Sequence, residues 1–320
     1  MKKIKIRKIY GLMALGAFLC LLPSVGLGQC NVSITTGQPP IQTSYPTITA
    51  AVNAAAPGNT INVSGTCTEI VFIFANKNFI TLDGGGTATI TCPPGACATQ
   101  RNVTILGKQI TITGFNITGG IAGITVAANG AATINRNTIH NTKRTGIGVV
   151  LNSHATILNN TIYDTGENPN FTERAGIAVS DNSSAMIGFN GPTDTVPSPN
   201  IIQNNPTGIL LTNTANARIV GNTISNNTDN GIMVIQGSQA EIADNEIDGN
   251  GQNGIFVSQG SGVYLGTTNN PIFDLPNSGT NGDKGLRCSI GGYIDGPLGD
   301  LKGLHGDLAI SKGCFNSVTK

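Results

Sequence analysis

The sequence has 320 residues, of which 43 are glycine and none is tryptophan, and its formal net charge at pH 7 is +1. The first 28 residues hold five basic residues and no acid, so the rest of the chain carries 13 Lys and Arg against 17 Asp and Glu, a net charge of −4. A chain without a basic face cannot neutralise phosphates, which excludes nucleic acid as an expected partner.

Residues 1–28 have the pattern of a signal peptide. A basic region is followed by an apolar run from Ile9 to Leu22, and the small residues Gly26 and Gly28 suit cleavage before Gln29. The apolar run is too short to span a bilayer comfortably, and no later segment is a transmembrane candidate. We therefore expect an exported protein, extracellular, periplasmic or on the cell surface, whose mature chain has no transmembrane segment.

Six cysteines remain after the signal peptide, and an even number in an exported chain favours disulfides. Six cysteines allow 15 connectivities. Closeness in the sequence favours Cys30–Cys67 across the N-terminal cap, Cys92–Cys97 and Cys288–Cys314. No histidine lies near any of them at ligand spacing, which disfavours a zinc site.

Residues 29–60 are predicted to form an N-terminal cap with a helix from Tyr45 to Ala56. Pro46 suits the first helical turn, Ile48 and Val52 lie on one apolar face, and Pro57-Gly58 ends the helix. Such a cap covers the apolar cross-section that the end of a stacked repeat array exposes.

Residues 61–266 contain a repeated pattern of Gly-Ile-x-Val, a small residue, Ile and then Asn-x-Ile. Its glycines are spaced by 23, 30, 32, 23 and 23 residues, so a 23-residue unit carries two insertions. The glycines in register are Gly123, Gly146, Gly176, Gly208, Gly231 and Gly254. A fixed period in this range is typical of a solenoid.

Each unit is predicted to form three short strands. Ile-x-Val and Ala-x-Ile alternate with a period of two, as in strands with one buried face. A lone asparagine then marks the corner before the third strand, and stacked coils would align these amides into a ladder. The corner residues are Asn137, Asn160, Asn200, Asn222 and Asn245. Parallel stacking adds about 4.8 Å per coil.

The Gly-Ile-x-Val strands, the asparagine column and the Asn-x-Ile strands resemble those of the pectate-lyase-like superfamily of right-handed parallel β-helix proteins. The resemblance covers Ile61 to Leu265 and implies an all-β, single-stranded solenoid with three strands per coil. That superfamily includes pectate and pectin lyases, polygalacturonases, alginate epimerases and non-enzymatic adhesins. The paired-Asp motif of the polygalacturonases and the Asp-Pro-His-Asp motif of the epimerases are not found in this sequence.

The resemblance places a ligand groove on the outward positions of the first strand. In this chain the residues between Ile and Val are Thr125, Gly148, Ala178, Leu210, Met233 and Phe256. A lyase needs a base and cations, and a hydrolase needs two carboxyl groups. This column supplies none of them, so catalysis stays undecided.

The best polar cluster lies in the turns that lead into the first strand. Arg144 and Arg174 both stand two residues before their glycines, so they are expected to stack on neighbouring coils and bind a uronate carboxylate. The candidate substrate-binding residues are His140, Lys143, Arg144, Tyr163, Asp164, Glu167, Glu173, Arg174 and Asp181. The favoured alternative is a surface salt-bridge network that holds a long loop.

No cofactor is predicted. Asp244, Glu246 and Asp248 have the spacing of one strand face and could hold Ca²⁺. The Asn245 corner interrupts that strand, so a solvated acidic edge is the favoured alternative.

From Thr267 the repeat is lost, and prolines and glycines predict a loop-rich tail over residues 267–320. Leu210, Met233 and Phe256 would form an exposed apolar stripe on three coils, and such stripes mark contacts. We expect the tail residues Ile272, Phe273 and Leu275 to cover it, with a second subunit or a sugar as alternatives.

Two classes of function follow. The first is an exported β-helix that engages extracellular polysaccharide along its first-strand face, and its enzymatic version is a lyase or hydrolase of acidic glycans. The second is a non-catalytic structural or adhesive cell-surface protein that uses the apolar stripe. The sequence leaves the glycan and the oligomeric state open.

Overall fold

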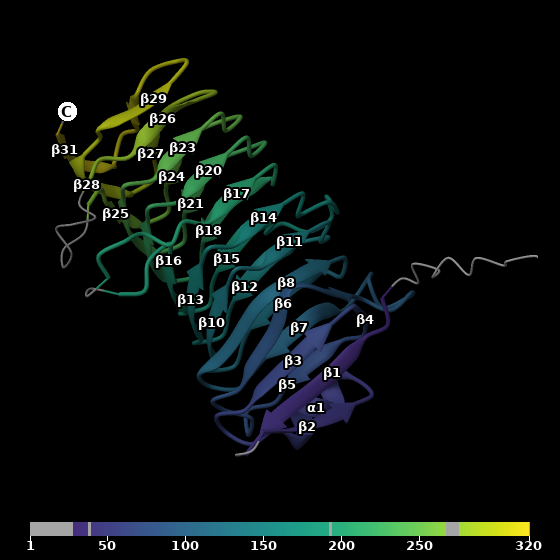
Figure 1. Cartoon of the computed structure of the whole chain (residues 1–320). Helices are drawn as coiled ribbons and strands as arrows, with labels where there is room; N and C mark the ends of the chain where they lie inside the picture. The colour runs from purple at the N-terminus through teal and green to yellow at the C-terminus, as the bar shows by residue number, and fades with distance from the viewer. Residues whose placement is uncertain (1–27, 38–39, 192–193, 267–274, 320) are drawn as a thin grey trace, which may run out of the picture.

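The computed structural model describes residues 28–37, 40–191, 194–266 and 275–319. Their strands form a 21-stranded and a ten-stranded sheet that run along one common axis. Figure 1 shows the coils stacked from the purple N-terminal cap to the yellow C-terminal coils. The predicted signal peptide lies outside the described residues except for Gly28. No described helix is long and apolar enough to cross a membrane.

The N-terminal cap consists of a hairpin and one short helix. Strands β1 (Asn31–Thr36) and β2 (Ile41–Tyr45) pair antiparallel, and β1 also pairs antiparallel with β3 (Thr60–Ser64). The predicted helix is confirmed as α1 (Ile48–Ala54), which begins later than expected because Thr47 is the N-cap and accepts a hydrogen bond from the Ala50 amide at 3.0 Å. The hairpin was not predicted.

The ten-stranded sheet contains the first strand of every coil. Its members are β5 (Val71–Ile73), β7 (Arg101–Ile105), β9 (Ala122–Val126), β12 (Thr145–Val149), β15 (Ala175–Val179), β18 (Thr207–Leu211), β21 (Ile232–Val234), β24 (Ile255–Val257), β27 (Leu286–Cys288) and β30 (Leu308–Ile310). Each strand pairs in parallel with the next coil, as the repeat predicts.

The second strands of the coils follow after a tight turn. They are β10 (Ala131–Asn135), β13 (His154–Leu158), β16 (Ser184–Ile187), β19 (Asn216–Val220), β22 (Gln239–Ala243), β25 (Gly262–Tyr264), β28 (Tyr293–Pro297) and β31 (Phe315–Thr319). The third strands are β11 (Thr138–His140), β14 (Thr161–Tyr163), β17 (Ile201–Gln203), β20 (Thr223–Ser225), β23 (Glu246–Asp248), β26 (Ser278–Asn281) and β29 (Asp300–Gly303).

In the first coils the second and third strands are less separated. Strand β4 (Thr66–Thr68) pairs with the long strand β6 (Thr81–Thr91), and β8 (Ile110–Thr118) pairs with both β10 and β11. The predicted coil of three short parallel strands is therefore confirmed from β9 onward.

The core is a stack of equivalent isoleucines. Ile209, Ile232 and Ile255 lie in register on successive first strands and are fully buried. The glycine before each isoleucine is required by packing: a Cβ on Gly231 would lie 2.6 Å from Ile247 Cγ2 and 2.8 Å from the Gly254 carbonyl oxygen. The repeated glycine therefore marks a close approach between the third strand and the next coil.

The predicted asparagine ladder is confirmed and extends by one rung. Each Nδ2 donates to the Oδ1 of the next coil at 2.8–3.1 Å, through Asn137, Asn160, Asn200, Asn222, Asn245 and Asn277. A second ladder, which was not predicted, joins Asn205, Asn227, Asn250 and Asn281 between the third and first strands at 2.8–3.2 Å. Both ladders satisfy buried backbone groups at the corners.

The prediction of a loop-rich tail is wrong for residues 278–319. Strands β26 to β31 pair in parallel with the preceding coils and add further turns to the solenoid. The motif was missed because Gly285-Leu286-Arg287-Cys288 has Leu and Cys in the positions of Ile and Val.

All three predicted disulfides are present. They join Cys30 to Cys67, Cys92 to Cys97 and Cys288 to Cys314, with Cα–Cα distances of 4.8, 5.3 and 6.1 Å. The third ties β27 to the segment just before β31. Several disulfides in one chain favour an oxidising compartment.

Candidate functional site

The outward face of the first strands is densely packed in the middle of the solenoid. Every residue of β9, β12, β15 and β18 is buried. Thr125 and Ala178 are 4% and 7% exposed because small side chains on neighbouring strands pack together. An open groove, which the resemblance implies, is therefore absent from these four strands.

The apolar stripe is also less exposed than predicted. Leu210 is 5% exposed and packs with Ala175 and Ala178, while Met233 is half-buried against the same cluster. Ile272 and Phe273 lie outside the described residues. Leu275 does not cover the stripe, since its carbonyl accepts from the Asp244 amide at 2.7 Å, beside the Asn245 corner, and its side chain is exposed.

One small cavity of about 40 Å³ opens on the first-strand face, toward its N-terminal half. Two arginines, Arg101 and Arg144, line it together with Glu173 and the hydroxyls of Thr125 and Ser180. A cavity of this volume has room for a few waters or one carboxylate group, rather than for a whole sugar ring.

Arg144 is held by the long turn that precedes β15. Its guanidinium forms an ion pair with Glu173 and lies 6.0 Å from the centre of the Phe171 ring. Both partners come from the first insertion, so this insertion walls one side of the cavity. The second insertion does not line this cavity, because it follows β16, where Phe189 packs against Val220.

Arg101, at the start of β7, is the residue that the sequence analysis missed. Burial and the positive charge of Arg144 both lower the pKa of its guanidinium. No residue in the described ranges forms an ion pair or a hydrogen bond with the Arg101 side chain. A half-buried guanidinium without an anion, beside a second guanidinium, favours binding of an anion.

The structure distributes the other predicted residues over several surfaces. His140 and Tyr163 stack on the third strands with ring centres 5.0 Å apart, and His140 Nε2 contacts Asn116 Oδ1 at 3.0 Å. Arg174 donates to the Gly166 carbonyl at 3.1 Å, so its guanidinium holds the loop while that of Arg144 meets Glu173. Substrate binding by these residues stays a prediction.

The remaining four candidate substrate-binding residues also lie apart from one another. Asp164 and Glu167 are exposed on the first insertion. Lys143 is half-buried in the turn before β12, where its backbone amide donates to the Gly120 carbonyl at 2.9 Å. The Asp181 carboxylate accepts from Ser180 Oγ at 3.0 Å and from Asn213 Nδ2 at 3.1 Å. It therefore fixes the turn after β15.

The described residues do not gather the predicted calcium ligands Asp244, Glu246 and Asp248 into one group. One set of potential ligand atoms does lie close together, namely those of Cys30, Cys67 and Glu69. The two sulfurs are joined in a disulfide, and the Glu69 carboxylate accepts from the Ile48 and Thr49 amides at the start of α1. These atoms therefore serve the cap.

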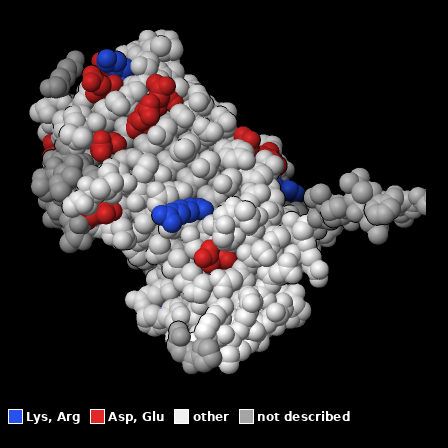
Figure 2. Space-filling model, in the orientation of Figure 1, with Lys and Arg blue, Asp and Glu red and all other residues white. Residues whose placement is uncertain are grey.

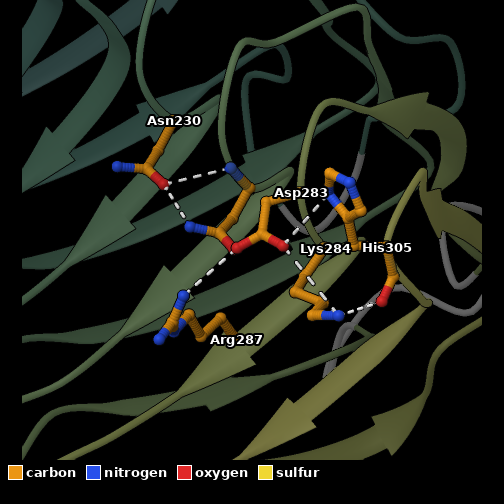
Figure 3. Close-up of polar contacts among 6 residues, drawn as sticks. Asn230, Asp283, Lys284, Arg287 and His305 are labelled. Atoms are coloured by element: carbon orange, nitrogen blue, oxygen red, sulfur yellow. Dashed lines mark hydrogen bonds and ion pairs between the residues drawn. The ribbon is translucent and has the colours of Figure 1, made fainter.

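A charged cluster in the C-terminal coils surrounds Asp283 (Figure 3). Its carboxylate lies 3.1 Å from Arg287, 3.6 Å from His305 and 3.9 Å from Lys284, and Lys284 also donates to the His305 carbonyl. The three partners belong to two successive coils. The cluster therefore fastens the last coils to one another.

Charge is unevenly distributed along the solenoid. Residues 77–174 contain 7 Lys and Arg against 4 Asp and Glu, whereas residues 181–319 contain 5 against 12. Figure 2 shows most of the acidic side chains of this face toward the C-terminal coils, with a largely uncharged surface elsewhere. The Arg101 cavity lies in the basic half.

A protein-family model described as "Right handed beta helix region" matches residues 59–193 and 178–285, which together cover more than half of the chain. The predicted right-handed parallel β-helix is thus confirmed. Comparison with curated proteins gives no significant match.

Two solved structures share the fold. An alginate lyase from Paenibacillus sp. str. FPU-7 aligns with a TM-score of 0.53 and 17% identity, over 84% of this chain and 96% of the lyase. The pectate lyase Pel9A aligns with a TM-score of 0.57 and 14% identity, over 85% of this chain and 72% of that one. At these identities the likeness is one of fold.

Proposed function

We propose, for a chain that belongs to the right-handed beta-helix family, that it is exported and binds an acidic polysaccharide at the Arg101 cavity. The observation that carries the proposal is the Arg101 guanidinium, half-buried beside Arg144 with no anionic partner among the described residues. A uronate carboxylate placed in the cavity would meet both guanidiniums and could accept two charge-assisted hydrogen bonds from one of them.

The size and surroundings of the cavity fit a carboxylate. At about 40 Å³ it admits this group while the sugar ring stays outside on the flat first-strand face. The Thr125 hydroxyl lines the same cavity and can donate to a second oxygen, whereas the Ser180 hydroxyl already donates to Asp181 Oδ2 at 3.0 Å. The basic half of the solenoid also reduces the repulsion that the net charge of −4 would exert on a polyanion.

Binding fits the lining residues better than hydrolysis does. A glycoside hydrolase needs two carboxyl groups on either side of the bond. Among the described residues that line the cavity, Glu173 is the one carboxylate, and it is paired with Arg144. A lyase is the second candidate, because it needs one base and cations beside the uronate, and because an alginate lyase and a pectate lyase share the fold of this chain.

The test is titration calorimetry with alginate and polygalacturonate, with dextran as the neutral control. We expect Arg101→Ala to weaken binding of the acidic polymer by about 10- to 100-fold, the value of a charge-assisted hydrogen bond. Lys108→Ala removes the same charge from an exposed position close to the end of β7 and should change affinity little. Equal affinity in the wild type and Arg101→Ala would refute the proposal.

A second variant separates a binding site from a surface salt bridge. Glu173→Gln removes the anion that pairs with Arg144, so the cavity gains net positive charge and should bind the polyanion several-fold more tightly. If the pair only holds the loop, this substitution will lower the denaturation midpoint and leave affinity unchanged. The appearance of unsaturated sugar ends during the same incubations would identify the lyase.

A further inference from the structure

A larger groove lies on a different face of the solenoid, on the outward side of the second strands. It encloses about 520 Å³ and crosses the strands from β13 to β28. The residues that matter here are His154, Arg218, Gln239, Glu241, Tyr264 and Tyr293. With five coil steps of about 4.8 Å, the groove is about 24 Å long and runs parallel to the solenoid axis.

The register arranges these side chains in two rows. Arg218, Glu241 and Tyr264 follow one another on successive strands in the first row. In the second row Gln239, Gly262 and Tyr293 do the same. A Cβ on Gly262 would lie 3.1 Å from the Gln239 amide carbon, so the amide lies over this glycine, which pairs with Tyr293 on the next strand.

The charges of the residues that line the groove cancel, and the Asp295 carboxylate beside it accepts from the Tyr293 hydroxyl. Arg218 Nε lies 2.7 Å from Glu241 Oε2, and both side chains are less than one third exposed. Burial lowers the pKa of His154, which therefore stays neutral at pH 7. A groove without net charge gives no advantage to a polyanion or a polycation, in contrast to the Arg101 cavity.

We propose that this groove binds a neutral oligosaccharide chain, laid along the solenoid axis. The Tyr264 and Tyr293 rings offer flat apolar faces to the C–H faces of sugar rings. The Tyr293 hydroxyl donates to Asp295 Oδ2 at 3.2 Å, so its oxygen is left to accept from a sugar hydroxyl. The carboxylate of Glu241 accepts from sugar hydroxyls, Arg218 donates to them, and the Gln239 amide does both. The volume lies within the range of small-molecule sites.

The two sites lie on different strands of the coil, so one protein would hold an acidic and a neutral glycan at the same time. The inference does not depend on the Arg101 cavity, because no residue lines both. A neutral-glycan site would support the second class of function, a non-catalytic structural or adhesive role. The surface that serves this role would then be the groove on the second strands, and not the apolar stripe.

The composition of the chain provides a direct readout. The sequence lacks tryptophan, and two of its four tyrosines after residue 28 lie in the groove, so ligand binding is visible in the tyrosine fluorescence. The probes are linear hexasaccharides of β-1,4-glucose, β-1,4-mannose, β-1,4-xylose and β-1,3-glucose. We expect at least one of them to change the emission in a saturable manner and to show saturation-transfer signals by NMR.

Tyr264→Ala and Tyr293→Ala should each weaken that binding by about tenfold or more, as expected for an aromatic anchor. Phe74→Ala is the matched control, since Phe74 is 48% exposed in the N-terminal coils and Tyr293 is 46% exposed. Arg101→Ala should leave neutral hexasaccharide binding unchanged.

Three results would overturn the inference. The first is that no hexasaccharide binds at millimolar concentration. The second is that Tyr264→Ala and Tyr293→Ala both bind the hexasaccharide with the affinity of the wild type. The third is a light-scattering mass of a dimer that falls to a monomer in these variants, which would assign the groove to a second copy of the chain. Circular dichroism of each variant confirms that it is folded.

Discussion

The asparagine ladder makes a quantitative prediction at Asn222, which is 1% exposed. Its Oδ1 accepts from the backbone N–H of Asn200 at 3.1 Å and from the side-chain Nδ2 of Asn200 at 2.8 Å. Its Nδ2 donates at 3.0 Å to Asn245 Oδ1 and to the carbonyls of Ile187 and Val220. Replacement by alanine therefore removes five polar contacts at one buried corner, three of which share the two Nδ2 hydrogens.

The cost follows from which groups lose their partner. In Asn222→Ala the backbone N–H of Asn200 loses its acceptor, whereas the side-chain Nδ2 of Asn200 still donates to the Ile157 carbonyl at 2.9 Å. One orphaned buried donor costs about 1–3 kcal/mol, and the weakened carbonyls add about 1 kcal/mol, so we expect a loss of about 2–4 kcal/mol.

Asn216→Ala is the matched control in the same coil. Asn216 is exposed on β19, and its amide makes one long bond of 3.5 Å to the Thr214 carbonyl, so its loss should cost less than about 0.5 kcal/mol. Guanidinium denaturation followed by circular dichroism compares the midpoints, which are the appropriate measure because repeat arrays can depart from two-state unfolding. Equal midpoints for the two variants would show that the ladder does not stabilise the corner.

Two further predictions concern packing and pH. Gly231→Ala should lower the midpoint strongly, because a Cβ on Gly231 would lie 2.8 Å from the Gly254 carbonyl oxygen and 2.6 Å from Ile247 Cγ2. Gly148→Ala should lower it less, because a Cβ there lies no closer than 3.7 Å to any atom; a reversed order would contradict the packing account. Burial raises the pKa of Asp244 above its usual 3.8, because the charged carboxylate is less stable in the folded protein than in water. The folded state therefore carries no penalty from Asp244 below pH 3.8, where the carboxyl is protonated, and is destabilised as the pH rises and the carboxyl ionises. Asp244→Asn should therefore raise the midpoint at pH 7, with a gain that disappears below about pH 3.8, and a gain independent of pH would exclude burial of the charge as the cause.

The repeat determines what the sequence can predict. Positions that face the core must match from coil to coil, so Ile232 and Asn222 stand in columns that can be read from the chain. The second ladder had a weaker signal of the same kind: Asn227, Asn250 and Asn281 stand four residues before Gly231, Gly254 and Gly285, while Asn205 stands three before Gly208. That shift of one residue concealed the column.

Arg101 was missed for a related physical reason. Its strand aligns with β9, and in that register Asn102 occupies the position of Gly123. Asn102 fits there because its Nδ2 donates to the Thr118 and Gly119 carbonyls at the corner that follows β8. Without the glycine, the coil lacks the motif that sets the register, so Arg101 could not be placed beside Arg144 from the sequence.

Outward positions carry no such constraint, and this is why neither site can be read from the repeat. Arg101, Tyr264 and Tyr293 need not resemble the residues one coil away, because their side chains do not enter the core. Each coil of a solenoid contacts mainly its neighbours, so a substitution on one outward face leaves distant coils nearly undisturbed. The same independence that hides the sites in the sequence allows a charged cavity and a neutral groove to coexist on one rigid core.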